Sequence, residues 1–389
     1  MYEKNLSILG LGGGGCRIIH RLAADCGDNS PAIISVDTDA DSLASYRAAI
    51  KLQIGASHTN GLGAGGDVNL GRLAAESDLE MIQELFKDTK LMFLVVALGG
   101  GTGTGAASVV LNAARDVGAV TLCFATLPFE FEGRQQKESA DQAVAELRAA
   151  SDALITIPND KLFELAGKTK VAEAFQTTDE VLSTGIGSIY KLITRPGFIN
   201  IDLAHLKNAI QNSGGVCSFG YGEGIGGDGA KTAVASLCGS SLTEEGQVIS
   251  RARSLLVSII GGPDLAMQDV GVIMEFIKKK APENCNISMG TVIDDGWSDR
   301  VTVAIIASDQ RVSEPAPAVV PEFPLAVEEK TLPEQLAGGK KKKKSRELQA
   351  KLRLEPSGKG RFKNIEPTIL DGEDMDIPAF VRRGIVIEK

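Results

Sequence analysis

Two glycine-rich segments carry the residues best suited to bind a phosphate-bearing ligand. One is Gly10–Gly15 (GLGGGG), which follows a short apolar run, and the other is Gly99–Gly105 (GGGTGTG), which follows the apolar run Leu91–Ala97. Glycine lets a backbone approach a phosphate closely, and free N–H groups at a helix N-terminus bind anions. Because a helix-forming segment follows each, we expect two phosphate-binding loops, with the hydroxyls of Thr102 and Thr104 as additional donors.

The first segment taken alone leaves other interpretations open. It matches the G-x-G-x-x-G fingerprint of dinucleotide sites, and Asp37 follows at the end of the next predicted strand, as in a nicotinamide-dependent dehydrogenase. The glycines can also serve only to turn the chain tightly. A dehydrogenase needs one such loop and leaves Gly99–Gly105 unexplained. Two loops on successive strands of one sheet indicate a triphosphate held from both sides.

The composition is that of a globular protein rich in glycine. The chain has 389 residues, 44 of them glycine, with 43% apolar and 23% charged residues and a net charge of −9. This acidic balance argues against nucleic acid as a partner. Six scattered cysteines and only three histidines give no zinc-site spacing, so we expect no protein-bound metal centre. The sequence predicts no signal peptide and no membrane insertion, and therefore a cytoplasmic protein.

Short apolar runs alternate with helix-forming segments through the first half of the chain. This alternation predicts an α/β fold with a Rossmann-like parallel sheet covered on both faces. A long helix is expected near Asp179–Ile193, stopped by Pro196, with a smaller αβ unit after it. The predicted strands are Leu6–Gly10, Ala32–Val36, Leu91–Ala97, Val120–Thr126, Ala153–Ile157, Ser254–Ile260, Ile287–Ile293 and Val301–Ala307, and the earlier helices are Cys16–Ala24 and Ala106–Val117.

The second glycine segment resembles the signature loop of the tubulin/FtsZ family, and further segments agree with its FtsZ branch in order and spacing. These are Gly61–Gly66 with Gly71-Arg72, Pro128–Gly133, Ile157–Asp160, Ala174-Phe175 with Asp179, and Arg195-Pro-Gly with Asn200-Ile-Asp202. The resemblance covers residues 5 to about 309 and resumes at Asp376–Arg383, which is similar to the FtsZ C-terminal peptide that tubulins lack. It implies a GTPase that polymerises head to tail into the filament of the bacterial division ring.

The resemblance also implies how GTP or GDP, with Mg²⁺, is held. Phe175 would stack on guanine, and Asp179, one helical turn later, would accept from the N1–H and N2–H₂ donors that adenine lacks. Asn159 would be a second base contact, and Glu132 would lie in the loop that contacts the ribose. Phe175 as an ordinary core aromatic and Asn159 as a turn residue remain alternatives. The implied nucleotide-binding set is Gly12, Gly13, Gly14, Gly15, Asp37, Gly65, Gly66, Gly99, Gly100, Gly101, Thr102, Gly103, Thr104, Gly105, Glu132, Arg134, Gln136, Asn159, Phe175 and Asp179.

Catalysis is implied for a different segment. Asn200, Asp202 and His205 lie in a stretch similar to the loop that each FtsZ subunit inserts into its neighbour's nucleotide site. Most of the family carries a second carboxylate at the position of His205. Asp202 can also be read as the N-cap of a following helix, and His205 as a neutral surface imidazole.

A second departure from the family pattern concerns the phosphates. Gln136 stands where the family often has a basic residue, and Arg134 or Lys137 can compensate. Together with His205, this departure keeps open an FtsZ-like structural filament that binds GTP but hydrolyses it little.

The expected organisation has five parts. They are a GTP-binding domain at 1–175, a central helix at 176–194, a C-terminal αβ domain at 195–312, a flexible linker at 313–372 and a peptide at 373–389. The linker contains Lys340–Lys344, read as a solvated tether or as a contact to anionic lipid or nucleic acid. By resemblance the peptide docks on a membrane-tethering division protein such as FtsA or ZipA, at the division site. Its expected contact residues are Asp376, Ile377, Pro378, Phe380, Val381, Arg382 and Arg383.

Overall fold

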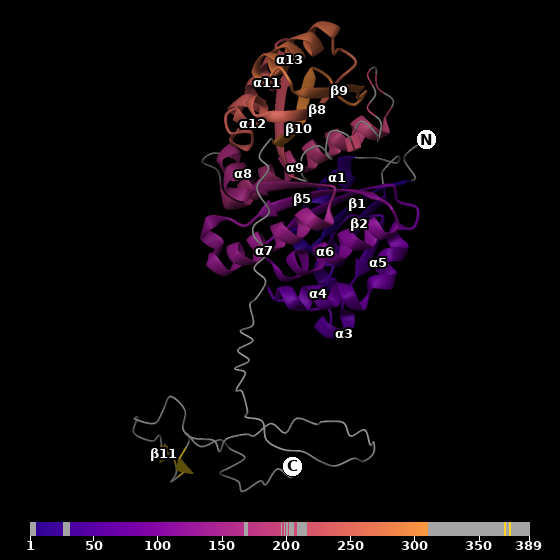
Figure 1. Ribbon diagram of the computed structural model, residues 1–389, viewed down its shortest axis with the longest axis vertical. Coiled ribbons are helices and arrows are strands. Elements are labelled where there is room, and N and C mark those ends of the chain that lie inside the picture. Colours follow the sequence, from indigo (N-terminus) through magenta and orange to yellow (C-terminus); the bar gives the residue numbers. More distant parts are fainter. Residues whose placement is uncertain are drawn as a thin grey trace, which may run out of the picture. The chain divides into compact units, whose positions relative to one another are not determined.

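A ten-stranded sheet runs through the first of the two units into which the chain divides (Figure 1). The computed structural model describes residues 5–25, 32–166, 170–195, 197, 199, 201, 206–207, 216–309, 369–370 and 373–374. The first unit is Met1–Ala318 and the second is Val319–Lys389. The described part of the second unit is an antiparallel pair of short strands, β11 (Ile369–Leu370) and β12 (Glu373–Asp374).

The strands of the sheet lie in the order β3-β2-β1-β4-β5-β6-β7-β10-β8-β9. They are β1 (Leu6–Leu11), β2 (Ala32–Asp37), β3 (Ile50–Gln53), β4 (Leu91–Ala97), β5 (Val120–Leu127), β6 (Ala153–Pro158), β7 (Val216–Ile225), β8 (Ala252–Gly261), β9 (Asn286–Ile293) and β10 (Arg300–Asp309). Neighbouring strands are parallel from β3 to β7, and β8 pairs with β9 in parallel. Only β10 runs antiparallel to both of its neighbours, β7 and β8. β7 pairs with β6 on one side and with β10 on the other, so it joins the strands of the first half of the chain to those of the second within one sheet.

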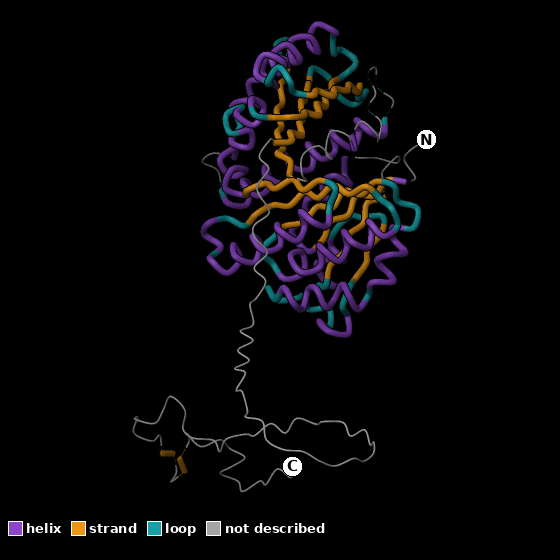
Figure 2. Tube along the Cα trace, in the orientation of Figure 1, coloured by secondary structure: helices purple, strands orange, loops and turns teal. Residues whose placement is uncertain are grey.

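Helices cover both faces of the first part of the sheet (Figure 2). One face packs against α1 (Gly12–Asp25) and α9 (Val171–Thr194). The other packs against α4 (Val68–Ser77), α5 (Leu79–Phe86), α6 (Gly101–Asp116) and α7 (Arg134–Ala150). In the second part, α11 (Gly229–Gly239) and α13 (Met267–Lys280) pack on β8 and β10. The shorter helices are α2 (Ala40–Ser45), α3 (Ala56–Thr59), α8 (Asn159–Ala166), α12 (Gln247–Ser250) and the 3₁₀ turns η3 (Glu130–Glu132) and η4 (Ser241–Thr243).

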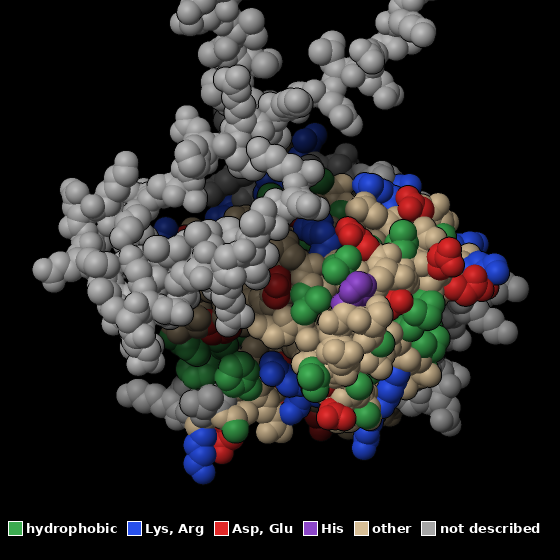
Figure 3. Space-filling view, turned by 90° about the horizontal axis from the view of Figure 1, so that it is seen from below, with side chains coloured by type: hydrophobic (Ala, Val, Ile, Leu, Met, Phe, Trp, Pro, Cys, Tyr) green, Lys and Arg blue, Asp and Glu red, His purple; other side chains and the backbone are tan. Residues whose placement is uncertain are grey.

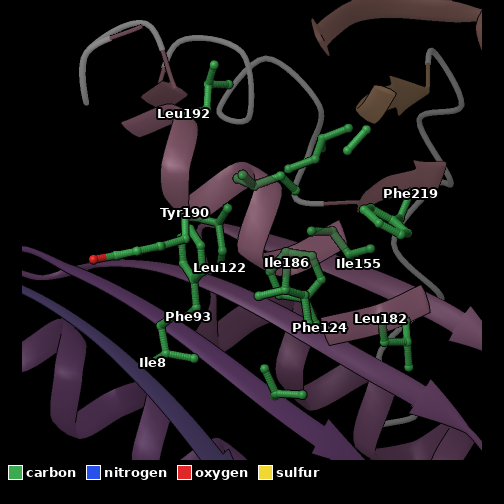
Figure 4. Close-up of a cluster of buried hydrophobic side chains, with 14 of the residues drawn as sticks. Ile8, Phe93, Leu122, Phe124, Ile155, Leu182, Ile186, Tyr190, Leu192 and Phe219 are labelled. Carbon is green, nitrogen blue, oxygen red and sulfur yellow. The ribbon is translucent and has the colours of Figure 1, made fainter. Parts of the chain in front are cut away.

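The core beneath α9 joins the two halves of the first unit (Figure 4). Leu182 and Ile186 recur at helical spacing on α9 and belong to one buried cluster with aromatic side chains of the sheet. Phe124 on β5 makes edge-to-face contacts with Phe93, at 5.9 Å between ring centroids, and with Phe219 on β7, at 6.3 Å. Each such fully buried side chain contributes about 1.5–3 kcal/mol to stability. The position of α9 is therefore fixed by apolar burial along its length.

The fold class predicted from the sequence is confirmed: the protein is α/β with a mostly parallel sheet. Three of the predicted helices begin earlier in the chain than we expected. α1 and α6 begin inside the glycine segments, at Gly12 and Gly101, and the long helix begins at Val171, so that the expected boundary between residues 175 and 176 falls inside α9. Strands β3 and β7 were not predicted. Among the described residues, no helix combines the length and apolar character needed to cross a bilayer.

Candidate nucleotide-binding site

Two helix N-termini meet at one edge of the sheet. β1 and β4 are adjacent and parallel, with Leu11 opposite Val96, so their carboxyl ends lie side by side. α1 starts directly after β1, and α6 starts shortly after β4. Gly12, with φ of 69°, brings the two turns together, since a Cβ there would lie 2.9 Å from the backbone nitrogen of Gly103. Both helices direct unsatisfied N–H groups and the positive end of a dipole toward the same space, as anion sites require.

Most glycines of this region fall into two groups. Six of them permit close packing, because a Cβ would collide with a neighbouring element; they are Gly12, Gly14, Gly15, Gly101, Gly103 and Gly105. Three others, Gly65, Gly66 and Gly100, have no atom within 4 Å of the place where a Cβ would stand. Tight packing thus explains part of the glycine pattern. It does not account for Gly100, whose φ of −86° suits any residue, so open space for a ligand is the remaining reason for a glycine there.

Side-chain hydrogen bonds hold the loops against each other. The hydroxyls of Thr38 and Thr102 lie 2.6 Å apart and link the end of β2 to α6. Thr104 Oγ1 accepts a hydrogen bond of 2.9 Å from the N–H of Gly99. Tyr46 donates its hydroxyl to the carbonyl of Gly13, at 3.2 Å. The loops are therefore ordered by contacts of their own, which reduces the entropy lost when a ligand binds.

Asp37 is buried beside the first loop, with 3% of its surface exposed. Its carboxylate accepts hydrogen bonds from the N–H groups of Thr38, at 2.8 Å, and Asp39, at 3.5 Å. Burial raises the pKa of this carboxyl group, and the two backbone donors work against that rise. Because Asp37 closes its own turn, it is poorly placed to reach a ribose in the manner of a dehydrogenase.

A cavity of about 750 Å³ lies beside the N-terminus of α6. It is lined by residues of the 65–69 loop, α4, the 99–104 turn and α7, among them Gly65, Gly66, Gly99, Gly100, Thr104 and Gln136. Among the described residues, Gln136 Oε1 is buried and has no hydrogen-bond partner. A buried acceptor left unpaired costs about 1–3 kcal/mol. Since an amide can be reversed without changing shape, Gln136 can equally turn its NH₂ group toward an anion in this space.

Three elements converge where a base would lie. Phe175 and Asp179 share one face of α9, as their spacing predicts, and Arg17 reaches them from α1. Arg17 Nε lies 2.7 Å from Asp179 Oδ2, and Arg17 Nη2 lies 3.3 Å from Oδ1. The guanidinium carbon is 5.3 Å from the centre of the Phe175 ring. Phe129 makes an edge-to-face contact with Phe175, at 5.4 Å between ring centroids.

Asp179 is an acidic group held in a nearly dry position. Its side chain is 5% exposed, and burial raises its pKa above the ordinary value, although the charge and hydrogen bonds of Arg17 oppose that rise. Arg21, one turn further along α1, acts on Asp179 through its charge alone. A carboxylate in this setting is available to accept two parallel N–H donors.

Three other residues of the predicted nucleotide-binding set are Glu132, Arg134 and Asn159. Glu132 Oε1 accepts from the N–H of Phe129, at 3.0 Å, so it fixes the 128–133 turn. Arg134 is paired with Glu138 at 2.6 Å, and its side chain is 91% exposed. Asn159 is the first residue of α8 and is half-buried. Arg134 in this arrangement is engaged by Glu138.

Some predicted site residues lie outside the part of the chain that the structure describes. They are Asn200, Asp202 and His205 of the expected catalytic segment, the lysine run Lys340–Lys344 and the peptide Asp376–Arg383. Their neighbours Ile201 and Leu206 are described and buried. In contrast, Arg17, Thr38, Tyr46 and Phe129 contact predicted site residues and were not themselves predicted. Their only signal in the sequence was proximity to a glycine loop or to a predicted site residue.

The face that carries α3 and α4 is seen in Figure 3. On its uncovered part, acidic and basic side chains are intermingled and are not gathered by sign. A nucleic-acid backbone would call for a cationic field, so this face does not favour such a ligand.

A parallel sheet with two glycine-bearing helix N-termini at one edge, next to a buried carboxylate and an aromatic ring, defines a nucleotide-binding α/β protein. Residues 5–167 match the Tubulin/FtsZ family, GTPase domain, and residues 215–311 match the FtsZ family, C-terminal domain. A curated relative, the cell division protein FtsZ of Aquifex aeolicus (strain VF5), is 37% identical over 305 residues, which are 78% of this chain and 82% of the relative. The chain belongs to the FtsZ family of GTPases.

Solved structures agree with this assignment. An empty FtsZ dimer from M. jannaschii superposes with a TM-score of 0.73 at 33% identity, covering 78% of this chain and 88% of that one. CetZ2 from Haloferax volcanii, solved as a GTPγS-bound protofilament, gives a TM-score of 0.65 at 21% identity, covering 80% and 94%. The second likeness concerns the fold alone.

Proposed function

We propose that this protein binds GTP at the edge shared by β1 and β4, polymerises head to tail with copies of itself and hydrolyses the nucleotide where two subunits meet. Its family is one of GTPases, and its relative from Aquifex aeolicus is named for cell division. We therefore infer a cytoskeletal filament of the division ring, acting in the cytoplasm at the division site. The GTP-binding part is 1–175, and the central helix α9, which begins inside that part at Val171, continues to 194, ahead of a C-terminal domain at 195–312.

One observation carries this proposal. The N-termini of α1 and α6 face one space, and Gly100, Gly65 and Gly66 leave room there for phosphates. Phe175 and Asp179 place an aromatic ring and a carboxylate on one face of α9, where a base could stack and donate hydrogen bonds. The geometry thus suits a ligand with an anionic end and an end that offers paired N–H donors, as guanosine triphosphate does.

Mg²⁺ fits this site only as a partner of the phosphates. Within the described ranges, no three carboxylate, imidazole or thiol groups gather in the manner of a metal site. Mg²⁺ commonly keeps several waters and binds through phosphate oxygens and one or two carboxylates. When bound it would neutralise phosphate charge, while this chain supplies backbone N–H groups and the Gln136 amide.

Hydrolysis in this proposal needs a second subunit. Asp202 of the neighbour would orient the attacking water or a cation, with Asn200 and His205 beside it. An interface of this kind joins two different surfaces and does not close, so it generates a filament. Neutral imidazole is a poorer Mg²⁺ ligand than carboxylate, so His205 predicts slower turnover than two carboxylates would give.

Light scattering and phosphate release, measured in parallel with GTP, GDP and NADH, test the proposal. We expect scattering and phosphate release with GTP and neither with GDP or NADH. Binding of NADH at the affinity of GTP, or scattering independent of nucleotide, would contradict it.

A filament with little hydrolysis is the second candidate, and one observation favours it. Gln136 is neutral, its oxygen is unpaired among the described residues, and the nearby Arg134 is engaged by Glu138. Assembly that persists for many minutes with less than one phosphate released per subunit would select this candidate.

The tail of the chain would connect the filament to the membrane. Residues 313–372 would act as a linker, and the peptide at 373–389 would dock its apolar residues on a membrane-tethering protein such as FtsA or ZipA. Many weak peptides displayed on one filament gain avidity of roughly 10²–10⁴.

A further inference from the structure

Arg17 lies where the proposed function places the guanine base. Its guanidinium donates to both oxygens of Asp179 and lies over the face of Phe175. These are the two side chains assigned to reading and stacking the base. The side chain of Arg17 is 48% exposed, whereas that of Asp179 is 5% exposed.

A guanidinium and a guanine base offer the same features to this pocket. Each is flat, and each presents two roughly parallel N–H donors along one edge, which suits the two oxygens of one carboxylate. Each can also lie on an aromatic ring, the guanidinium through cation–π attraction and the base through stacking. Adenine has no such donor pair. The contacts of Arg17 are therefore those expected of guanine.

Both groups cannot hold these contacts at once. Arg17 uses one edge of the carboxylate and one face of the ring, and Phe129 packs edge-on against Phe175. The high exposure of Arg17 leaves it free to swing into solvent, while Asp179 stays buried. An unpaired buried carboxylate is costly, so Asp179 keeps Arg17 as its partner until another donor replaces it.

We propose that Arg17 is an internal stand-in for guanine, which occupies the base subsite in the nucleotide-free protein and has to be displaced when the nucleotide binds. This inference rests on the proposed GTP site and names a regulatory residue within it. Arg17 then lowers the apparent affinity for the nucleotide. If it occupies the subsite in about nine-tenths of the molecules, it raises the apparent Kd about tenfold.

Calorimetric titration with GDP, which avoids assembly, tests this inference on the full chain. Arg17→Ala should bind GDP about tenfold more tightly than wild type, and Arg17→Lys, which keeps the charge but loses the paired donors, about threefold more tightly. Arg21→Ala is the matched control, because it removes the same charge from the same helix without touching Asp179 directly. It should stay within about twofold of wild type. If Arg17→Ala does not fold, the affinity of Arg17→Lys for GDP tests the inference.

Two results would overturn the inference. If both Arg17 variants bind GDP as tightly as wild type or more weakly, Arg17 does not compete with the base. If Arg21→Ala binds GDP as tightly as Arg17→Ala does, the effect comes from the loss of positive charge in general. ADP serves to separate this failure from that of the proposed function. If wild type and all variants bind GDP no better than ADP, Asp179 does not select guanine. The proposed guanine site is then refuted, independently of the result for Arg17.

Discussion

Lys191, near the end of α9, forms an ion pair of 2.6 Å with Asp294 in the loop between β9 and β10. Both side chains are largely buried, at 12% and 14% exposed. The ring of Trp297 in the same loop contacts two cations, with its centre 5.0 Å from Lys191 Nζ and 4.5 Å from the Arg300 guanidinium carbon. The polar contacts of this cluster hold the end of α9 against the loop between β9 and β10. They add to the apolar contacts that α9 makes with the sheet.

Lys191→Ala should lower the free energy of unfolding by about 1–3 kcal/mol, because it leaves Asp294 largely buried without its main partner. Urea unfolding followed by circular dichroism measures the change. Lys278→Ala, at the exposed end of α13, removes the same charge and should change stability by less than about 0.5 kcal/mol. Equal effects of the two variants would show that the Lys191 pair is unimportant.

The same pair has a pH dependence. Burial raises the pKa of Asp294, but Lys191, the Gly296 N–H and Arg195 together outweigh burial and hold that pKa below its ordinary value. A carboxyl group with a lowered folded-state pKa stabilises the protein above its unfolded pKa of about 3.9, and this contribution is lost as pH falls through the folded value. The stability difference between wild type and Lys191→Ala should be constant from about pH 7 to 5 and shrink below about pH 4. A difference that grows on acidification would contradict this assignment.

Asp179→Ala should weaken GTP binding by about 1.5–3 kcal/mol, the worth of hydrogen bonds to a charged group, and should reduce the preference for GTP over ATP. Titration with both nucleotides measures this change. Glu180→Ala, an exposed acidic neighbour on α9, is the control and should bind like wild type. Equal affinity of the wild type for ATP and GTP would refute the assignment of Asp179.

Gln136→Arg should strengthen binding of a non-hydrolysable GTP analogue about tenfold and GDP less, because it places a cation beside the turn at Gly99. Gln135→Arg adds the same charge one residue away at an exposed position and should have a smaller effect. If both variants gain equally, Gln136 does not face the terminal phosphate.

Asp202→Ala should abolish most GTP hydrolysis while sparing GTP binding, since the residue is proposed to act on the nucleotide of the next subunit. Loss of a charge-stabilising group in phosphoryl transfer can cost ~10³–10⁵ in rate. His205→Asp should raise turnover if the missing carboxylate limits it. Phosphate release per assembled subunit measures both. A fast wild type that His205→Asp slows would give the imidazole an active role.

Deleting residues 374–389 should leave GTP-driven assembly intact and abolish recruitment to membranes that carry the tethering partner. Sedimentation of filaments and of vesicles bearing that partner separates the two properties. Loss of assembly in the shortened protein would mean that the tail contributes to the fold.

The parallel strands could be predicted because both of their faces are buried. Runs such as Leu91–Ala97 are apolar at every position, and such a run indicates a strand covered by helices on both sides. β7 was missed because it carries glycine at alternate positions. At Gly222 and Gly224 a Cβ would collide with the backbone of Ala233 and Gly229 on α11. The need for glycine there comes from a helix packed on the strand, which local sequence does not reveal.

The parts of the candidate site formed by one short segment could be predicted from the sequence. The parts formed where two distant segments meet could not. The glycine turns and the spacing of Phe175 and Asp179 on one helical face could be read directly. Arg17 could not, because it lies 162 residues from Asp179 and reaches it only through the packing of α1 on α9. Nor does sequence distinguish Gly103, needed for packing, from Gly100, which leaves space open.

α9 has a mechanical consequence that its residues do not show singly. It is one continuous helix of 24 residues, about 36 Å long, with Phe175 and Asp179 in its first turns and Lys191 in its last. A tilt of about 5° around the first end would shift the other by about 3 Å, because a helix of this length transmits rotation as a lever does. A group that enters or leaves the base subsite touches the first turns of α9, so a small tilt there becomes a larger displacement at the other end of the helix. From that end the chain continues toward the segment expected to serve the neighbouring subunit.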